Sequence, residues 1–249
     1  MHPNHFLCLS ILVCLLLGLS SPVVLQAADD TSTPWRVSNA LGLPAWLQLS
    51  GHHRLRYETL DGQFRANRQG NEHILVLRTA LQAALTFDRF EFVAEFMDSR
   101  QELADRRSPI DTSIVNTFAL LQGYVAINFP DLLQEGSQAR VQLGRQTMDF
   151  GSRRLIARNR FRNTLNNFTG INTSWTAASG PTIRAFYFLP VNREPADAVS
   201  LLDNDTEFDE EDFDLQFWGL AVEMPQLWPN INGELFVFGL HEDDSPSRM

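Results

Sequence analysis

The sequence predicts an all-β protein whose strands form an antiparallel transmembrane β-barrel. Three observations support this. Long runs of residues alternate between apolar and polar side chains, which indicates strands with one apolar and one polar face. Short connections between these runs alternate with long ones, as in outer-membrane barrels. After Leu19, no apolar run reaches the roughly eighteen residues of a membrane helix, so a chain that spans a membrane must do so with strands.

The first 45 residues precede the alternating pattern. The apolar run from Phe6 to Leu19 has the length of a signal-peptide core, and a possible cleavage site lies near Ala27 or Ala28. Residues 1–27 are therefore predicted to be a signal peptide, with a membrane anchor as the alternative. Residues 28–45 are polar and interrupted by proline, and are predicted to form a periplasmic arm.

Both cysteines, Cys8 and Cys14, lie in the predicted signal peptide. The exported chain would therefore hold neither a disulfide nor a thiolate metal site. A cysteine-free exported chain of this size is typical of the periplasm or outer membrane of a Gram-negative bacterium, and we predict the cell outer membrane.

Residues 46–249 are predicted to form the barrel domain, with about nine strands. The expected strands are Trp46 to Thr59, His73 to Phe87, Phe90 to Met97, Phe118 to Phe129, Arg140 to Phe150, Ile171 to Ala177, Thr182 to Leu189, Asp214 to Glu223 and Gly233 to Leu240. A soluble β-sandwich also alternates in polarity, but its strands usually have about five to six residues. Strand length therefore favours the barrel. Aromatic residues near the expected strand ends support it weakly, because such residues gather at membrane interfaces; they are Trp46, Phe87, Phe90, Phe129, Trp175 and Trp228.

Positive charge is concentrated in the stretch from Gly144 to Gly170, which holds six of the twenty basic residues of a chain with net charge −10. All basic residues are Arg, whose planar guanidinium suits carboxylates and phosphates. If this stretch folds inward, it forms a positive constriction. The alternative is a solvated surface loop, for example one that binds lipopolysaccharide phosphates.

Strand alternation places further arginines inside the barrel, because a charge on the lipid face costs about 2 to 4 kcal/mol at the midplane. Arg54, Arg56 and Arg78 are assigned to the interior in this way, together with Glu91 and Glu95. Arg145 shares the parity of Leu143, so it requires either a bulge at Gly144 or a position near the rim. The bulge is favoured.

The other long connection is acidic. From Glu194 to Asp214 there are ten acidic residues and no basic one. This spacing lacks the glycine and ligand order of an EF-hand, so a flexible solvated loop is favoured over a calcium site. If mobile, such a loop could cover the Arg-rich stretch.

No enzyme, cofactor or metal site is expected. The chain has no HExxH, GxSxG, P-loop or dinucleotide motif. Tyr57 and Tyr124 are the candidate bases for a polysaccharide lyase, without a supporting motif. Nucleic-acid binding is disfavoured by the acidity and by the export signal.

At GRQTMDFGSRRLIARNRFRNTLNNFTGI the sequence resembles the alginate export family of outer-membrane β-barrel porins. The resemblance rests on Gly144-Arg145-Gln146, Gly151, Arg154-Leu155, Asn163-Thr164 and Phe168-Thr169-Gly170, with Asp98 and Arg100 in matching places upstream. It implies passive passage of alginate or a similar anionic polymer through an Arg-lined pore. Together with the alternation, it suggests substrate contacts at Arg54, Arg56, Arg78, Asp98, Arg100, Arg145, Arg153 and Arg154. Thr169 stands where the family usually has Asp, and Leu165-Asn166 where it tends toward Gly-Arg, so the substrate could differ.

Family barrels have roughly twice the strands counted here, and this sequence ends HEDDSPSRM rather than on a strand with a terminal aromatic. We therefore expect an incomplete barrel, roughly the N-terminal half, forming a curved open sheet. The expected partners are an anionic polysaccharide or small anionic solute, outer-membrane lipid and the barrel-assembly machinery. An exported β-sandwich lectin that binds acidic glycans is the alternative function.

Overall fold

A computed structural model of the chain describes residues 37–61, 72–104, 108, 110–151, 153–158 and 160–243. The chain divides into two units, Met1–Arg36 and Val37–Met249, and every described residue belongs to the second. The predicted signal peptide and the first part of the predicted arm lie outside the described residues. The rest of the arm contains one short helix, α2 (Val37–Ala40).

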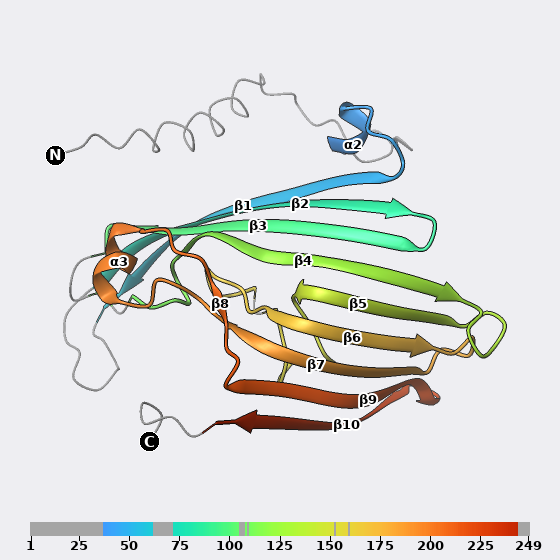
Figure 1. The fold of residues 1–249 in the computed structure, drawn as a ribbon. Coiled ribbons are helices and arrows are strands. Elements are labelled where there is room, and N and C mark those ends of the chain that lie inside the picture. The colour runs from blue at the N-terminus through green and yellow to red at the C-terminus, as the bar shows by residue number, and fades with distance from the viewer. Residues whose placement is uncertain are drawn as a thin grey trace. The chain divides into compact units, whose positions relative to one another are not determined.

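The described part of the chain forms one antiparallel sheet of nine long strands and one short strand (Figure 1). Strands that follow each other in sequence pair with each other, with one exception: β9 pairs with β7, and the short β8 pairs with β7 but not with β9. The strands are β1 (Leu47–Leu60), β2 (Glu72–Phe87), β3 (Phe90–Glu102), β4 (Asn116–Pro130), β5 (Gln138–Gln146), β6 (Phe168–Thr176), β7 (Thr182–Asn192), β8 (Glu210–Glu211), β9 (Leu215–Trp228) and β10 (Ile231–Glu242). A second short helix, α3 (Ala198–Asp203), precedes β8.

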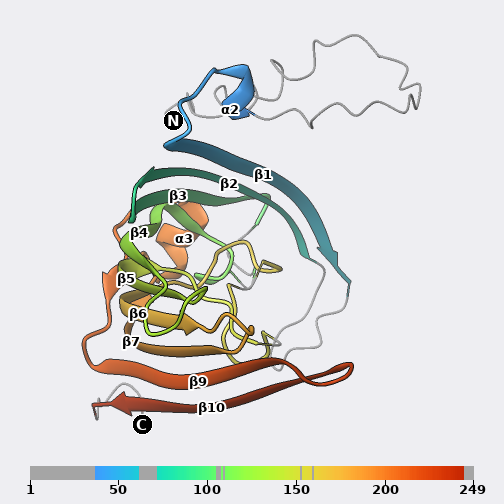
Figure 2. The same cartoon turned by 90° about the vertical axis from the view of Figure 1, so that its right-hand side faces the viewer.

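The sheet is curved and open. β1 and β10 stand at the two ends of the strand order, and Figure 2 shows the sheet bending from β1 through β7 to β10 around a concave side. The predicted all-β fold, a curved open antiparallel sheet, is confirmed. Each terminal strand presents a row of backbone donors and acceptors along its outer edge.

All short connections lie at one end of the sheet and the long ones at the other, because neighbouring strands run antiparallel. Residues 88–89, 131–137, 177–181 and 229–230 form the short-turn end. Residues 103–115, 147–167 and 193–214 belong to the long-loop end, which is on the left in Figure 1. The six aromatic residues predicted near strand ends all lie at the short-turn end, where Trp46 stacks on Phe87 with ring centres 5.4 Å apart.

Several strand boundaries differ from the prediction, and two of these differences have a tertiary cause. β3 continues to Glu102 although the sequence turns polar at Asp98, because the pairing with β2 extends to Leu75 opposite Glu102. β5 ends at Gln146, before the predicted end at Phe150. The apolar residues that follow leave the sheet and pack against its face, as described below.

The two faces of the sheet differ because successive strand residues point to opposite sides. The inner face holds two buried apolar clusters, one on β7 and β9 and the other on β2, β3 and β4. Both clusters also contain residues of the connection between β5 and β6, namely Met148, Phe150, Ile156 and Leu165. The opposite, outer face exposes large apolar side chains.

The outer face is apolar across most of the sheet. Leu81, Phe92, Leu143, Leu220 and Val237 are each at least 41% exposed, and they come from five different strands. An exposed apolar surface of this extent marks contact with lipid or with another protein. The helices in the described ranges are too short or too polar to cross a membrane.

Candidate functional site

The connection between β5 and β6, residues 147–167, crosses the inner face and is called the inner segment. Figure 2 shows it, in yellow-green, on the concave side between β1 and β9. Leu165 packs on β2, β3 and β4, whereas the ring of Phe150 contacts Phe236 and Phe238 on β10. The inner segment thus reaches from β10 to β2. Of the two arrangements left open for this Arg-rich stretch, the structure has the folded-in one.

Three arginines predicted to line the pore hold the inner segment in place. Arg54 Nη2 and Arg78 Nη1 donate to the carbonyl oxygen of Arg162, at 2.8 and 3.1 Å. Arg56 Nη1 donates to the carbonyl oxygen of Phe161 at 2.6 Å, and its guanidinium lies 5.2 Å from the centre of that ring. These arginines therefore position the inner segment instead of lying free for a ligand.

Asn163 is buried, 1% exposed, at the centre of this contact. Its Nδ2 donates to the carbonyl oxygens of Leu77 at 3.0 Å and Ile114 at 2.8 Å, and its Oδ1 accepts from Arg54 Nη2 at 3.2 Å. Its own carbonyl oxygen accepts from Ser99 Oγ at 2.9 Å. One side chain thus connects the inner segment to β1, β2 and the connection after β3.

A buried ion pair holds the middle of the inner segment. Arg158 Nη2 pairs with Glu95 Oε1 on β3, and the two side chains are 17% and 5% exposed. Gln122 Nε2 donates to the other carboxylate oxygen at 2.6 Å, and Gln122 Oε1 accepts from the backbone N of Thr147 at 3.2 Å. A buried charge pair is stable only when its remaining polar atoms are also hydrogen-bonded, and Gln122 meets that need.

Four arginines of the inner segment remain exposed: Arg153, Arg154, Arg160 and Arg162. The side chain of Arg153 is 64% exposed and lies 3.4 Å from Asp149. Among the described residues, the other three guanidiniums make no ion pair. Four permanent positive charges therefore lie on the inner segment, which crosses the concave side of the sheet.

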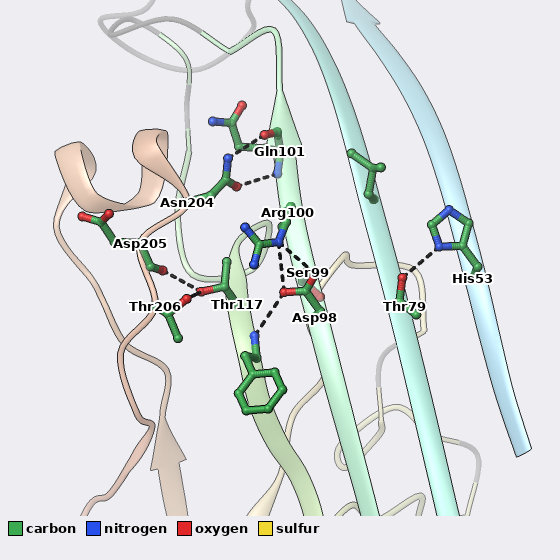
Figure 3. A network of polar contacts seen from close by, with 12 residues as sticks. His53, Thr79, Asp98, Ser99, Arg100, Gln101, Thr117, Asn204, Asp205 and Thr206 are labelled. Atoms are coloured by element: carbon green, nitrogen blue, oxygen red, sulfur yellow. Dashed lines mark hydrogen bonds and ion pairs between the residues drawn. The ribbon is translucent and has the colours of Figure 1, made fainter. Parts of the chain in front are cut away.

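Asp98 and Arg100 were predicted to be substrate contacts in the pore, but they lie on the outer face of the sheet. The residues between and before them, Ser99 and Met97, contact the inner segment, so alternation turns Asp98 and Arg100 to the outer face. There Arg100 Nε donates to both carboxylate oxygens of Asp98, at 3.1 and 2.9 Å. Asp98 Oδ1 also accepts from the backbone N of Phe118 at 3.2 Å (Figure 3).

Residues 193–214, called the acidic strap, are tied to the long-loop end of β3 and β4. Asn204 exchanges two hydrogen bonds of 2.9 Å with the backbone of Gln101 (Figure 3). Asn116 Nδ2 donates to both carboxylate oxygens of Asp209 at 3.0 Å. The sequence favoured a flexible, solvated loop, and no sequence pattern indicated these anchors.

Arg145 forms an ion pair with the acidic strap, unlike the four exposed arginines of the inner segment. Its Nη2 donates to Glu211 Oε1 at 2.5 Å, and Thr169 Oγ1 donates to the same oxygen at 2.8 Å. The pairing of β5 with β4 and β6 passes Gly144 without a register shift. The favoured bulge is therefore wrong, and Arg145 is the penultimate residue of β5, near the rim.

The Arg145–Glu211 contact is expected to weaken only in acid. Burial raises the pKa of Glu211, but the hydrogen bonds from Arg145 and Thr169 outweigh it and leave the pKa below the ordinary 4.5. A carboxyl with a lowered folded-state pKa stabilises the fold above its ordinary pKa, and this contribution is lost as pH falls through the folded-state pKa. Thermal unfolding in detergent of wild type and Glu211→Gln should therefore differ at neutral pH and converge below pH 4.5.

Wild type is compared with Glu211→Gln, and not examined alone, because a second carboxyl in the acidic strap, Asp209, also titrates in acid. Burial raises the pKa of Asp209 despite its hydrogen bonds from Asn116 and Glu194, so its effect on stability runs in the opposite direction as pH falls. Because Asp209 is present in both proteins, it cancels in the difference. A difference that does not change with pH would contradict the assignment to Glu211.

Sequence reasoning missed the partners of several inner-face groups. Alternation placed Glu95 inside, but nothing in the sequence pairs it with Arg158, which is 63 residues away. Asn163 was visible as part of the Asn-Thr element of the family pattern, which could have marked it. Gly151 was visible in the same way: its φ is +47°, and an added Cβ would meet the carboxylate of Glu234 on β10.

The candidate lyase bases lie in different places. The Tyr57 hydroxyl contacts His73 Nδ1 at 3.0 Å, and Tyr57 itself is exposed. The Tyr124 hydroxyl donates to Glu91 Oε1 at 3.2 Å, and Glu91 also pairs with Arg140 at 3.0 Å. In the described ranges, no group of three or more His, Cys, Asp or Glu side chains is arranged to hold a metal ion.

Comparison with known proteins gave a match to one protein family. The family model for alginate export matches residues 45–232, which include every strand from β1 to β9 and the inner segment. That family consists of outer-membrane transport porins and is not an enzyme family. No curated protein and no solved structure gave a significant match. The matched region covers most of the chain, and the chain therefore belongs to the alginate export family.

Proposed function

We propose that this chain is part of an outer-membrane porin for the diffusion or export of an anionic polysaccharide such as alginate, or of a related anionic solute. The observation that carries the proposal is the inner segment, which holds exposed guanidiniums across the concave side of a sheet with an apolar outer face. Family membership supports polysaccharide export in general.

The contacts to the solute are assigned to Arg153, Arg154, Arg160 and Arg162. Guanidiniums bind carboxylates in a bidentate manner, and uronate units carry one carboxylate each. An exposed ion pair contributes only about 0.2 to 1 kcal/mol, so several weak contacts in a row attract a polymer without trapping it. Arg54, Arg56 and Arg78 act indirectly, because they hold the segment that carries these side chains.

The proposed porin function also implies how the chain is oriented in the outer membrane. Residues 1–27 would direct export, and residues 28–45 would lie on the periplasmic side together with the short-turn end. The apolar outer face would contact outer-membrane lipid after insertion by the barrel-assembly machinery. The long loops and the acidic strap would then face the cell exterior.

Ion conductance in planar bilayers tests the transport function. The wild-type protein is expected to prefer anions and to be blocked by added polyuronate. Changing all four exposed arginines to Gln should abolish the anion preference and weaken the polyuronate block by roughly fivefold or more, because about 1 to 4 kcal/mol of weak contacts are lost. A threefold control changes Arg89, Arg100 and Arg140 to Gln; among the described residues, the side chains of these arginines make no hydrogen bond to the inner segment.

Two results would overturn the proposal. An unchanged polyuronate block in the fourfold variant would remove the exposed arginines from the pore. Recovery of the protein in the soluble fraction without detergent would remove the membrane placement and favour the lectin alternative.

A further inference from the structure

The outer face contains an apolar groove of about 340 Å³ near the short-turn end of the sheet. Its floor is a row of small residues on three neighbouring strands: Ala83 is opposite Ala94, and Ala94 is opposite Gly123. Its wall is the adjacent row of large residues on the same face, Leu85, Phe92, Val125 and Leu143. The groove follows from this difference in side-chain size between two rows.

The other side of the floor is bounded by a second row of large residues. Leu81 and Phe96 are opposite each other and are 64% and 44% exposed. The floor is thus a shallow channel between two apolar ridges. The lining is mainly apolar, so water gains few hydrogen bonds in the groove and a hydrocarbon chain fits it better.

The groove lies a fixed distance from the interfacial aromatic residues. Phe87 and Phe90 close the turn between β2 and β3, and Trp46 stacks on Phe87. Ala83 and Ala94 are four residues further along the two strands, or roughly 13 Å at about 3.3 Å per residue. Arg89 stands at the tip of this turn, exposed, and within the described residues it makes no ion pair.

We propose that this groove binds one acyl chain of a phospholipid of the periplasmic leaflet, with the lipid phosphate beside Arg89. The proposal rests on the membrane placement given above, but not on polysaccharide transport. The arrangement matches the lipid from end to end: the charged group lies at the turn, the aromatic rings at the interface, and the apolar groove below them.

Filling the groove tests the proposal. Wild type, Ala94→Phe and Ala185→Phe are purified in a mild detergent, supplied with palmitoyl-oleoyl phosphatidylglycerol, and examined for retained lipid by native mass spectrometry. Ala94→Phe is expected to lower retention roughly tenfold. Ala185 is also on the outer face, on β7 opposite Thr173 and away from the groove, so the Ala185→Phe control should retain lipid as wild type does.

A second probe separates the acyl chain from the headgroup. Arg89→Gln should weaken retention of phosphatidylglycerol and leave retention of dioleoylglycerol, which has no phosphate, unchanged. Equal retention by wild type and Ala94→Phe, or equal loss in both phenylalanine variants, overturns the groove assignment. Polyuronate block of the pore should be the same in wild type and Ala94→Phe, so a failure here is distinct from a failure of the transport proposal.

Discussion

Changing Arg158 to Met is expected to detach the inner segment from β3 and β4 while the sheet stays folded. Glu95, with a side chain only 5% exposed, would lose its ion-pair partner, and among the described residues it would keep the hydrogen bond from Gln122. Removing one partner of a buried pair costs about 3 to 5 kcal/mol. The inner segment is a connection between strands and is not part of the hydrogen-bonded sheet. The lost free energy therefore weakens the binding of the inner segment to the sheet and leaves the strand pairing intact.

Trypsin sensitivity measures this detachment, because the inner segment carries exposed arginines. The variant should be cleaved within residues 147–167 much faster than wild type, with an increased pore conductance. Arg140→Met is the matched control, because it removes an ion pair with Glu91 on β3 that is more exposed than the pair of Arg158. The Arg140 side chain hydrogen-bonds to Glu91 and Asn128, both outside the inner segment, so residues 147–167 should stay as protected from trypsin as in wild type.

A second substitution identifies the cause of the change. Adding Glu95→Gln to Arg158→Met removes the unpaired buried charge, and should restore much of the protection from trypsin. If the double variant is cleaved as fast as Arg158→Met, the buried charge is not what detaches the segment.

Changing Asn163 to Ala is expected to cost nearly as much where the inner segment contacts β1 and β2. The carbonyl oxygens of Leu77 and Ile114 would lose a donor, and Arg54 would lose an acceptor. Each buried polar group left without a partner costs about 1 to 3 kcal/mol. We expect a lower unfolding temperature in detergent and cleavage at Arg160 and Arg162.

Asn166→Ala provides the comparison for this variant. Asn166 is half-buried, and its contact in the structure is with Arg193 at 2.9 Å, so its loss should cost about 1 kcal/mol or less. Equal destabilisation by the two substitutions would show that Asn163 has no special role. Asn163→Asp, which keeps the acceptor but removes both donors, should resemble the alanine variant.

Strand alternation correctly predicts the face of the sheet on which most of the candidate site residues lie. It placed Arg54, Arg56 and Arg78 on the face that the inner segment contacts. Continued along β3, the same alternation that assigns Glu95 to this face assigns Asp98 and Arg100 to the other. The resemblance in that region led to the wrong face for these two residues, and the local period was the better guide.

The role of each arginine could not be read from the sequence. An interior arginine can bind a solute, a carbonyl oxygen or a carboxylate, and the choice depends on what the chain brings within reach. Arg54 meets the backbone of residues more than a hundred positions away, and Arg145 meets Glu211 in the acidic strap. Both contacts close large loops, which leave no local pattern in the sequence.

The sequence by itself determined the class of fold, the antiparallel order of the long strands and the apolar outer face, because these depend on the two-residue period and on turn position. Tertiary structure alone decided that the inner segment folds inward, that it leaves Arg153, Arg154, Arg160 and Arg162 exposed, and that the acidic strap is anchored. These outcomes depend on Glu95, Asn163 and two apolar clusters meeting residues far along the chain. Such contacts follow from packing and from the pairing of buried polar groups, which no local pattern encodes.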